Sequence, residues 1–158
     1  VLDDVRSLHN VGSVFRSSDA FRIEAIYLCG ITACPPHAEI HKTALGAEDS
    51  VTWEYFSDTK DAIARLHQKG CYVYAIEQVE NACQLPHIDL EAAQKVAPSF
   101  AVVFGNEVKG VKQEVVDVCD GCLEIPQFGT KHSLNVSVAA GIVIWEFARQ
   151  LLLDTQTR

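Results

Sequence analysis

The chain has 158 residues, of which 48% are hydrophobic and 22% charged, a composition typical of a globular protein with enough length for one buried core. Its net charge of -8 argues against a surface that binds phosphates through an overall excess of Lys and Arg. The acidic excess is concentrated between residues 44 and 100. Basic residues lie instead in or beside three motif-like stretches: Arg6, Arg16, Arg22, Lys109, Lys112 and Lys131. The overall sign therefore does not exclude a nucleic-acid partner.

Hydrophobic patterning predicts strands and helices that alternate along the whole chain. Strands are expected at residues 1–5, 25–30, 51–56, 71–76, 99–105 and 122–125. Helices are expected after Asn10, at residues 36–47, 59–69, 90–96 and 112–119, and from about Ser133 onward. This alternation predicts an α/β fold, with a mostly parallel sheet and helices on both faces. No linker or repeat interrupts it, so we expect a single domain over residues 1–158.

Two polar residues are expected to be the N-caps of helices. Asn10 precedes a helix whose buried face includes Phe15, and Arg16 lies at the margin of that face. Ser133 precedes a run that is apolar nearly all round as far as Trp145. Such a helix must be covered on more than one side, by its own sheet and a second layer or by a partner subunit. We expect a charge at Val143 to disrupt that partner interface.

The apolar run is shorter than the roughly 20 residues that a membrane span needs, so no membrane association is predicted. Six cysteines without a signal peptide indicate reduced thiols and a cytoplasmic location. Cys119 and Cys122 form one C-x-x-C pair, and His37 and His41 have helical i,i+4 spacing. A second C-x-x-C is absent from the sequence, so neither a metal site nor a redox site is predicted.

Two polar loops follow predicted strands, which is where ligands bind in parallel sheets. They span residues 105–110 and 127–133, and each contains glycine, which lets the backbone approach a ligand closely. The first loop has neither the G-x-G-x-x-G pattern of a dinucleotide site nor the G-K-[ST] ending of a P-loop. A simpler interpretation is a core helix with a plain surface loop before it. That interpretation does not explain the polar cluster at the helix entrance, which we expect to be buried: Lys131, His132, Ser133 and Asn135.

Three stretches together resemble the SpoU/TrmH branch of the SPOUT RNA methyltransferases. Asn10, Gly12 and Arg16 are similar to the family's N-x-G-x-x-x-R pattern. The second stretch, similar to F-G-x-E-x-x-G, comprises Phe104, Gly105, Asn106, Glu107 and Gly110. The third, similar to I-P…G…S-L-N-V-S-x-A, comprises Ile125, Pro126, Gly129 and residues 133–139. Val108 departs from the pattern, because many relatives have glycine there. Many relatives have an RNA-recruiting extension before this domain, and the sequence leaves open whether this protein has one.

The resemblance implies a SPOUT-type α/β fold with a C-terminal trefoil knot, although knots are otherwise almost absent from proteins. It implies S-adenosylmethionine as cofactor, methyl transfer to a ribose 2′-hydroxyl of tRNA or rRNA, and a homodimer with its active site at the interface. It implies RNA as partner, without DNA or a membrane. The implied cofactor-binding residues are Phe104, Gly105, Asn106, Gly110, Ile125, Pro126, Ser133 and Leu134.

The resemblance also assigns catalytic roles. Arg16 would act on the 2′-hydroxyl, helped by an RNA phosphate or by Glu107, because a free guanidinium is a weak base. Asn10 would order the site, and Glu107 would position Arg16 or a dimer contact. Ser133 and Asn135 would hold the substrate ribose or the methionine end of the cofactor. For Arg16 a plain surface role, and for Leu134 plain core packing, stay open.

Two other function classes are considered. One is a non-catalytic RNA-binding or assembly module on the same fold. Such a module would have no physical reason to keep the five predicted catalytic residues together: Asn10, Arg16, Glu107, Ser133 and Asn135. The other is a nucleotide-dependent oxidoreductase, which the missing phosphate-binding patterns disfavour. The sequence does not select the RNA, the nucleotide or the position.

Overall fold

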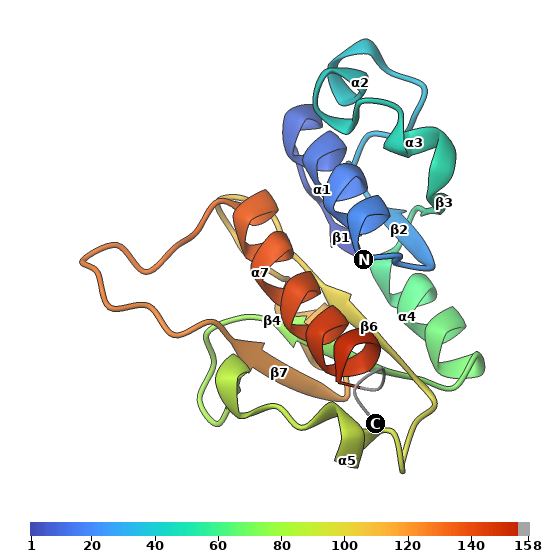
Figure 1. The fold of residues 1–158 in the computed structure, drawn as a ribbon. Coiled ribbons are helices and arrows are strands. Elements are labelled where there is room, and N and C mark those ends of the chain that lie inside the picture. Colours follow the sequence, from blue (N-terminus) through green and yellow to red (C-terminus); the bar gives the residue numbers. More distant parts are fainter. Residues whose placement is uncertain (155–158) are drawn as a thin grey trace.

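The computed structural model describes residues 1–154 (Figure 1). The strands in this part of the chain are β1 (Leu2–Asp3), β2 (Ala25–Cys29), β3 (Thr52–Phe56), β4 (Cys71–Ile76), β5 (Cys83–Gln84), β6 (Ser99–Val103) and β7 (Gly121–Glu124). The α-helices are α1 (Leu8–Ala20), α2 (Ala38–Ala44), α3 (Ala47–Ser50), α4 (Thr59–Gln68), α5 (Leu90–Ala93), α6 (Gln113–Val116) and α7 (Val136–Ala148). A short 3-10 helix η1 (Leu85–His87) precedes α5, and a π-helix η2 (Arg149–Leu153) continues α7.

The strands form two parallel sheets that meet at β1. Their orders are β1-β2-β3 and β5-β7-β4-β6, and all pairings between these strands are parallel. Leu2 forms a parallel bridge with Phe104, directly after β6, where the Asp3 N–H donates to the Phe104 carbonyl at 2.8 Å. The predicted mostly parallel sheet is therefore confirmed, with β1 linking its two halves.

Helices cover both faces of the sheet, as predicted. Side chains alternate along β4: Tyr74 packs against the core cluster that contains residues of α1 and α7, and Val73 lies in a second cluster on the other side. Ile63 of α4 and Val115 of α6 belong to the same second cluster. Figure 1 shows α1 and α7 side by side, in agreement with their contacts.

Several predicted boundaries were wrong. One expected helix is divided into α2 and α3, because Leu45 and Gly46 have left-handed backbone angles (φ 53° and 95°) that end α2. The helices expected at 90–96 and 112–119 are single turns, α5 and α6. The last strand, β7, begins at Gly121, one residue before the expected strand.

Both predicted N-caps were also wrong. Ser7 caps α1 by accepting a hydrogen bond from the Asn10 N–H at 3.2 Å, and Asn10 lies inside the helix with its side chain turned to other partners. Asn135 caps α7, because its Oδ1 accepts from the Ser137 N–H at 2.9 Å. Ser133 is exposed in the preceding loop, so the entrance to α7 is not buried within one chain.

The burial pattern of α7 corrects the expectation for Val143. Val143 is fully buried in the core of its own chain, so a charge there would disrupt folding and would not act on an interface. The exposed apolar side chains of α7 are instead Val138, Ile142 and Trp145, which recur at helical spacing on one side.

The expectation that the last helix is too short for a membrane span was wrong for its length. Residues Val136–Leu153 form one 18-residue helical segment that is long and apolar enough by composition to cross a membrane. Core helices meet the same criterion, and the inner side of α7 is part of the main core cluster, with Ala140, Val143 and Phe147 buried.

Gly12 provides a test of the packing between α1 and α2. A Cβ at this position would overlap Thr43 Oγ1 and the Ile40 carbonyl oxygen, and a backbone atom has little freedom to move. Gly12→Ala should therefore lower the free energy of unfolding by about 1–3 kcal/mol, as overpacking does. Gly129→Ala, where a Cβ would meet no atom within 4 Å, is the control and should change it by less than about 0.5 kcal/mol. Urea unfolding measures both, and equal stabilities would contradict the close-packing argument.

Candidate functional site

A cavity of about 290 Å³ lies at the carboxyl ends of β4, β6 and β7. Its lining includes the residues that directly follow or nearly follow those strands, Glu77, Gly105 and Ile125. This is the edge of a parallel sheet where ligands bind, and the volume is at the lower end of the range for ligand pockets, about 300–1,000 Å³. Apolar and carboxylate side chains share the lining.

Two glycines shape the first wall of the cavity. Asn106 and Gly110 pair across the loop after β6, with N–H···O distances of 3.0 and 2.9 Å. A Cβ at Gly105 would overlap the Gly110 and Val111 backbone, and a Cβ at Gly110, whose φ is 69°, would overlap the Glu77 carboxylate. Both positions therefore require glycine, which places bare backbone along the cavity.

Glu77 is a site residue that the sequence reasoning missed. Its Oε2 accepts a hydrogen bond from the Val111 N–H at 2.9 Å, and its Oε1 accepts one from the Gln78 N–H at 3.2 Å. It therefore connects the end of β4 to the loop that follows β6. The available signal was an acidic residue directly after a strongly predicted parallel strand, at the same sheet edge as the two recognised loops.

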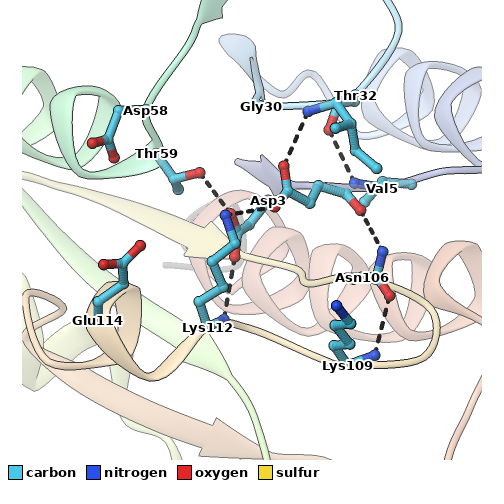
Figure 2. Close-up of polar contacts among 12 residues, drawn as sticks. Asp3, Val5, Gly30, Thr32, Asp58, Thr59, Asn106, Lys109, Lys112 and Glu114 are labelled. Carbon is cyan, nitrogen blue, oxygen red and sulfur yellow. Dashed lines mark hydrogen bonds and ion pairs between the residues drawn. The ribbon is translucent and has the colours of Figure 1, made fainter.

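Asn106 lines the cavity, but its side chain is used to shape the loop. Its Nδ2 donates to the Asp4 carbonyl at 2.8 Å, and its Oδ1 accepts from the Lys109 N–H at 3.1 Å (Figure 2). The same Oδ1 also accepts from the Val108 N–H at 2.9 Å. Val108 is 81% exposed and is not among the residues with positive φ. Valine in place of the usual glycine is thus accommodated without left-handed backbone.

Polar contacts around β1 hold the same loop from the other side (Figure 2). The buried Asp3 carboxylate accepts from Thr59 Oγ1 at 2.6 Å and from the Lys112 N–H at 3.3 Å. Lys112 Nζ forms a 2.6 Å ion pair with Asp4. Burial raises the pKa of Asp4, but hydrogen bonds from Lys112 and the Ile31 N–H outweigh it and leave that pKa below its ordinary value.

A chain of hydrogen bonds joins the three motif-like stretches. The Glu107 carboxylate accepts from the N–H groups of Arg6 and Ser7, each at 2.9 Å, and from Asn10 Nδ2 at 3.2 Å. Asn10 Oδ1 in turn accepts from Asn135 Nδ2 at 3.2 Å. Residues about 100 and 125 positions apart are thereby fixed at one edge of the cavity.

The same hydrogen bonds set the charge of Glu107. Burial raises the pKa of its carboxyl, but the N–H groups of Arg6 and Ser7 and the Asn10 amide hold the net pKa below the ordinary value. Glu107 is therefore ionised at neutral pH. Its acceptor capacity is directed at α1, so it orients the site and is poorly placed to take a proton from a substrate.

Most of the sequence-predicted cofactor residues line the cavity: Phe104, Gly105, Asn106, Gly110, Ile125, Ser133 and Leu134. Pro126 is the exception, because it is not part of the lining. Among the predicted catalytic residues, Glu107 and Ser133 line the cavity, and Asn10 and Asn135 reach its edge through the hydrogen-bond chain. Leu134 is 39% exposed, so it is not plain core packing.

Arg16 is not brought to the cavity within one chain. It is exposed on α1, does not line the cavity, and its side chain forms no hydrogen bond or ion pair within residues 1–154. A long cation without a partner is free to contact something outside the chain. Apart from Pro126, the other predicted site residues line the cavity or are hydrogen-bonded within the chain, whereas Arg16 is available.

The C-x-x-C thiols have environments that oppose metal or redox chemistry. Burial raises the pKa of Cys119 to about 12 and the pKa of Cys122 above its ordinary value. A protonated thiol is a poor nucleophile and a poor metal ligand. Within residues 1–154 no cluster of three or more His, Cys, Asp or Glu could hold a metal ion.

The sequence matches the SpoU rRNA Methylase family over residues 1–145. The chain belongs to this SpoU family. It is 32% identical over 152 residues to the 23S rRNA (guanosine-2′-O-)-methyltransferase RlmB of Vibrio vulnificus, covering 96% of this chain and 59% of that protein. It is also 32% identical over 152 residues to the tRNA (guanosine(18)-2′-O)-methyltransferase of Thermus thermophilus, covering 96% and 74%. The chain thus spans about 59% of the length of the RlmB relative.

Solved structures of the SpoU and TrmH type share the fold. An AdoMet-bound rRNA methyltransferase from Sinorhizobium meliloti superposes with a TM-score of 0.84 at 28% identity, covering 96% of this chain and 55% of that one. A TrmH/SpoU tRNA modifying enzyme from A. aeolicus superposes with a TM-score of 0.82 at 25% identity, covering 98% and 75%. The mixed α/β fold with parallel sheets is therefore that of known SpoU methyltransferases.

Glu107→Gln provides a pH-dependent test of the hydrogen-bond chain. Because the folded-state pKa of Glu107 is lowered, its ionised form stabilises the fold above the unfolded-state pKa, and this contribution is lost as the pH falls through the folded-state pKa. The wild type should therefore unfold at a higher urea concentration than Glu107→Gln at pH 7. The difference should shrink once the pH falls below the ordinary value of 4.5.

Glu80→Gln controls for the change in net charge, because the exposed Glu80 side chain forms no hydrogen bond or ion pair within residues 1–154. It should be as stable as the wild type across the same pH range. If the difference in unfolding urea concentration between the wild type and Glu107→Gln stays constant from pH 7 to about pH 3.5, ionisation of Glu107 does not support the site.

Proposed function

We propose that this chain is the catalytic domain of a methyltransferase that transfers a methyl group from S-adenosylmethionine to a ribose 2′-hydroxyl in tRNA or rRNA. The observation that carries the proposal is the Glu107–Asn10–Asn135 hydrogen-bond chain, which assembles three separate motifs at one cavity. The names of the relatives support the reaction, and the AdoMet-bound relative supports the cofactor.

The lining of the cavity suits S-adenosylmethionine in its contacts and charge. The bare backbone of Gly105 and Gly110 allows close approach of a flat adenine, and apolar side chains of Phe104 and Leu134 adjoin it. Glu77 in the same lining suits a ligand with a positively charged sulfonium and amino group. When bound, the cofactor would supply an electrophilic methyl group and leave as a neutral thioether.

The residues of this chain would orient and activate the nucleophile. A ribose hydroxyl is almost fully protonated at neutral pH, so its attack needs a group that stabilises the developing negative charge on O2′ and guides the departing proton. Arg16 can donate hydrogen bonds to O2′ and to an adjacent RNA phosphate, and that phosphate would accept the departing proton directly, because a guanidinium has no acceptor of its own. Ser133, exposed at the cavity, would hold the ribose, while Glu107, Asn10 and Asn135 keep the loops in place.

We also propose that the protein is a homodimer and that the exposed apolar side of α7 forms its interface. Val138, Ile142 and Trp145 are 51%, 38% and 46% exposed, and Gly141 between them has open space where a Cβ would be. Arg16 lies on α1, which packs against α7, and it does not reach its own cavity. An α7 interface would let Arg16 of one subunit serve the cavity of the other.

The strand order supports a trefoil knot. Strand β7 lies between β4 and β5, which are consecutive in the sequence, so the connection between β4 and β5 crosses the end of β7. The segment that leaves β7 must pass this connection to reach α7. We propose that it threads through, as in the resembling family, and an experimental structure that traces residues 77–82 and 125–135 would test this.

A cytoplasmic location is part of the proposal. All six cysteines are unpaired, which fits a reducing compartment where RNA substrates are also present.

Arg16→Ala tests the catalytic assignment. Arg16 is separate from the cavity lining, so the affinity for S-adenosylmethionine by calorimetry should be unchanged, and methyl transfer to saturating RNA should fall by at least about 100-fold. Arg16→Lys should not restore transfer, because an ammonium cannot reproduce the planar fork of guanidinium donors. Arg65→Ala on α4 is the control and should behave as wild type.

Methyl transfer is measured as ribose-methylated nucleosides by mass spectrometry, with tRNA and rRNA from cells that lack the gene as substrates. Wild-type turnover by Arg16→Ala would remove Arg16 from the mechanism. RNA binding without any methyl transfer by the wild type would point instead to a non-catalytic RNA-binding module.

Ile142→Glu tests the dimer. A charge in the apolar side of α7 should convert a dimer into a monomer, with little loss of stability in the single chain because Ile142 is already partly exposed. Val96→Glu, at an 81% exposed position that follows α5, should leave the dimer intact. Light scattering at micromolar concentration reports the mass, and a monomeric wild type would rule the dimer out.

A further inference from the structure

The loop between β7 and α7 presents an aromatic side chain to solvent. Phe128 is 96% exposed, the highest value among the exposed large hydrophobic residues of the described chain. No aromatic contact involves it within residues 1–154, and a Cβ on the neighbouring Gly129 would meet no atom within 4 Å. Figure 1 shows this segment, in orange, extending well away from the sheet. The fold therefore gives Phe128 no packing role.

The same loop is connected to the cavity at both ends. Gln127 on one side and His132 and Ser133 on the other line the cavity, whereas residues 128–131 are exposed and do not. A molecule that places one group in the cavity would extend past this projecting segment. RNA does so by necessity, because the nucleotides beside the reacting one continue in both directions.

The chemistry of the segment fits a nucleobase better than a protein surface. Residues 125–135 contain no carboxylate, although the chain has a net charge of -8. Lys131 is an exposed cation, and the neighbouring His132 is exposed as well. Phe128 is flanked by Gln127, Gly129 and Thr130, so it does not belong to a continuous apolar patch of the kind that a second subunit would cover. A single ring among hydrogen-bonding groups matches a base, which is flat with polar edges.

We propose that Phe128 is a stacking platform for a nucleobase next to the methylated nucleotide, and that Lys131 contacts an adjoining phosphate. This inference rests on the proposed function and extends it to substrate recognition. A base can stack on the ring whatever its identity, so Phe128 selects unpaired nucleotides over a regular duplex. The substrate class is thus an RNA loop or single-stranded segment.

Three variants of Phe128 separate stacking from plain apolar contact. Affinity for unfractionated tRNA and for ribosomal RNA fragments is measured by filter binding at fixed salt concentration. Phe128→Ala and Phe128→Leu should both bind about 5- to 150-fold more weakly, the range for loss of one stacked base, and Phe128→Tyr should bind like the wild type. Val96→Ala, which removes another exposed apolar side chain, is the matched control and should also bind like the wild type.

The salt dependence of binding tests the two residues separately. Lys131→Gln should reduce the slope of log affinity against log salt by about 0.7, the value for one contact with a single-stranded phosphate, whereas Phe128→Ala should leave the slope unchanged. Affinity for S-adenosylmethionine and the mass by light scattering should be the same in the wild type and in all Phe128 variants.

The contrary outcomes are distinct. Full RNA affinity in Phe128→Leu would show a plain apolar contact, and a change of mass in Phe128→Ala would assign the ring to a subunit interface. Weaker binding of S-adenosylmethionine in Phe128→Ala would assign it to the cofactor site. Each of these overturns the stacking role while the proposed function stands. A wild-type chain that binds neither RNA preparation would overturn the proposed function as well.

Discussion

The Glu107 carboxylate connects the loop after β6 to the start of α1, and the geometry of the site depends on this connection. The first N–H groups of a helix and of the turn before it have no partners inside the helix, and a negative charge there is favourable. Glu107 accepts from Arg6 and Ser7 just before α1, while its third hydrogen bond fixes Asn10. Asn10 then holds Asn135, the N-cap of α7, so both helices begin at the same edge of the cavity.

This arrangement separates residues that build the site from residues that are free to act. Asn10, Asn106 and Glu107 direct their side chains at other parts of the chain, and their removal would move whole loops. Arg16 and Ser133 are exposed, and Arg16 has no partner within residues 1–154. A catalytic or binding group has to keep its hydrogen-bonding capacity for the substrate, whereas a framework group satisfies it internally.

Under the proposed function, the acidic character of the domain limits how it would recognise RNA. Of the basic residues near the motifs, Lys112 is paired with Asp4 and so contributes little charge to a binding surface. The remaining ones are exposed: Arg6, Arg16, Arg22, Lys109 and Lys131. Few phosphate contacts give weak non-specific attraction, so the proposed RNA recognition would rely more on local shape and stacking than on charge.

Much of the fold could be predicted from the sequence because strands and loops leave local signals. The unbroken apolar run Cys71–Ile76 predicted β4 with its observed bounds, and glycine-bearing loops after strands predicted two walls of the cavity. Glu77, the residue that joins these walls, was recognisable only as an acidic residue after a strand. Its bond to Val111 spans 34 positions and has no local pattern.

The helix caps and the exposed side of α7 were decided by tertiary structure alone. Asn10 and Ser133 have the chemistry of caps, but Asn10 bonds Glu107 and Asn135 across the fold, which leaves the cap of α1 to Ser7. The sequence determined that α7 is apolar on nearly every side. For that reason it could not determine which side of α7 packs against its own chain. Packing against α1 and the sheet buried Val143 and left Ile142 exposed, because periodicity identifies a buried face only where polar residues mark the opposite one.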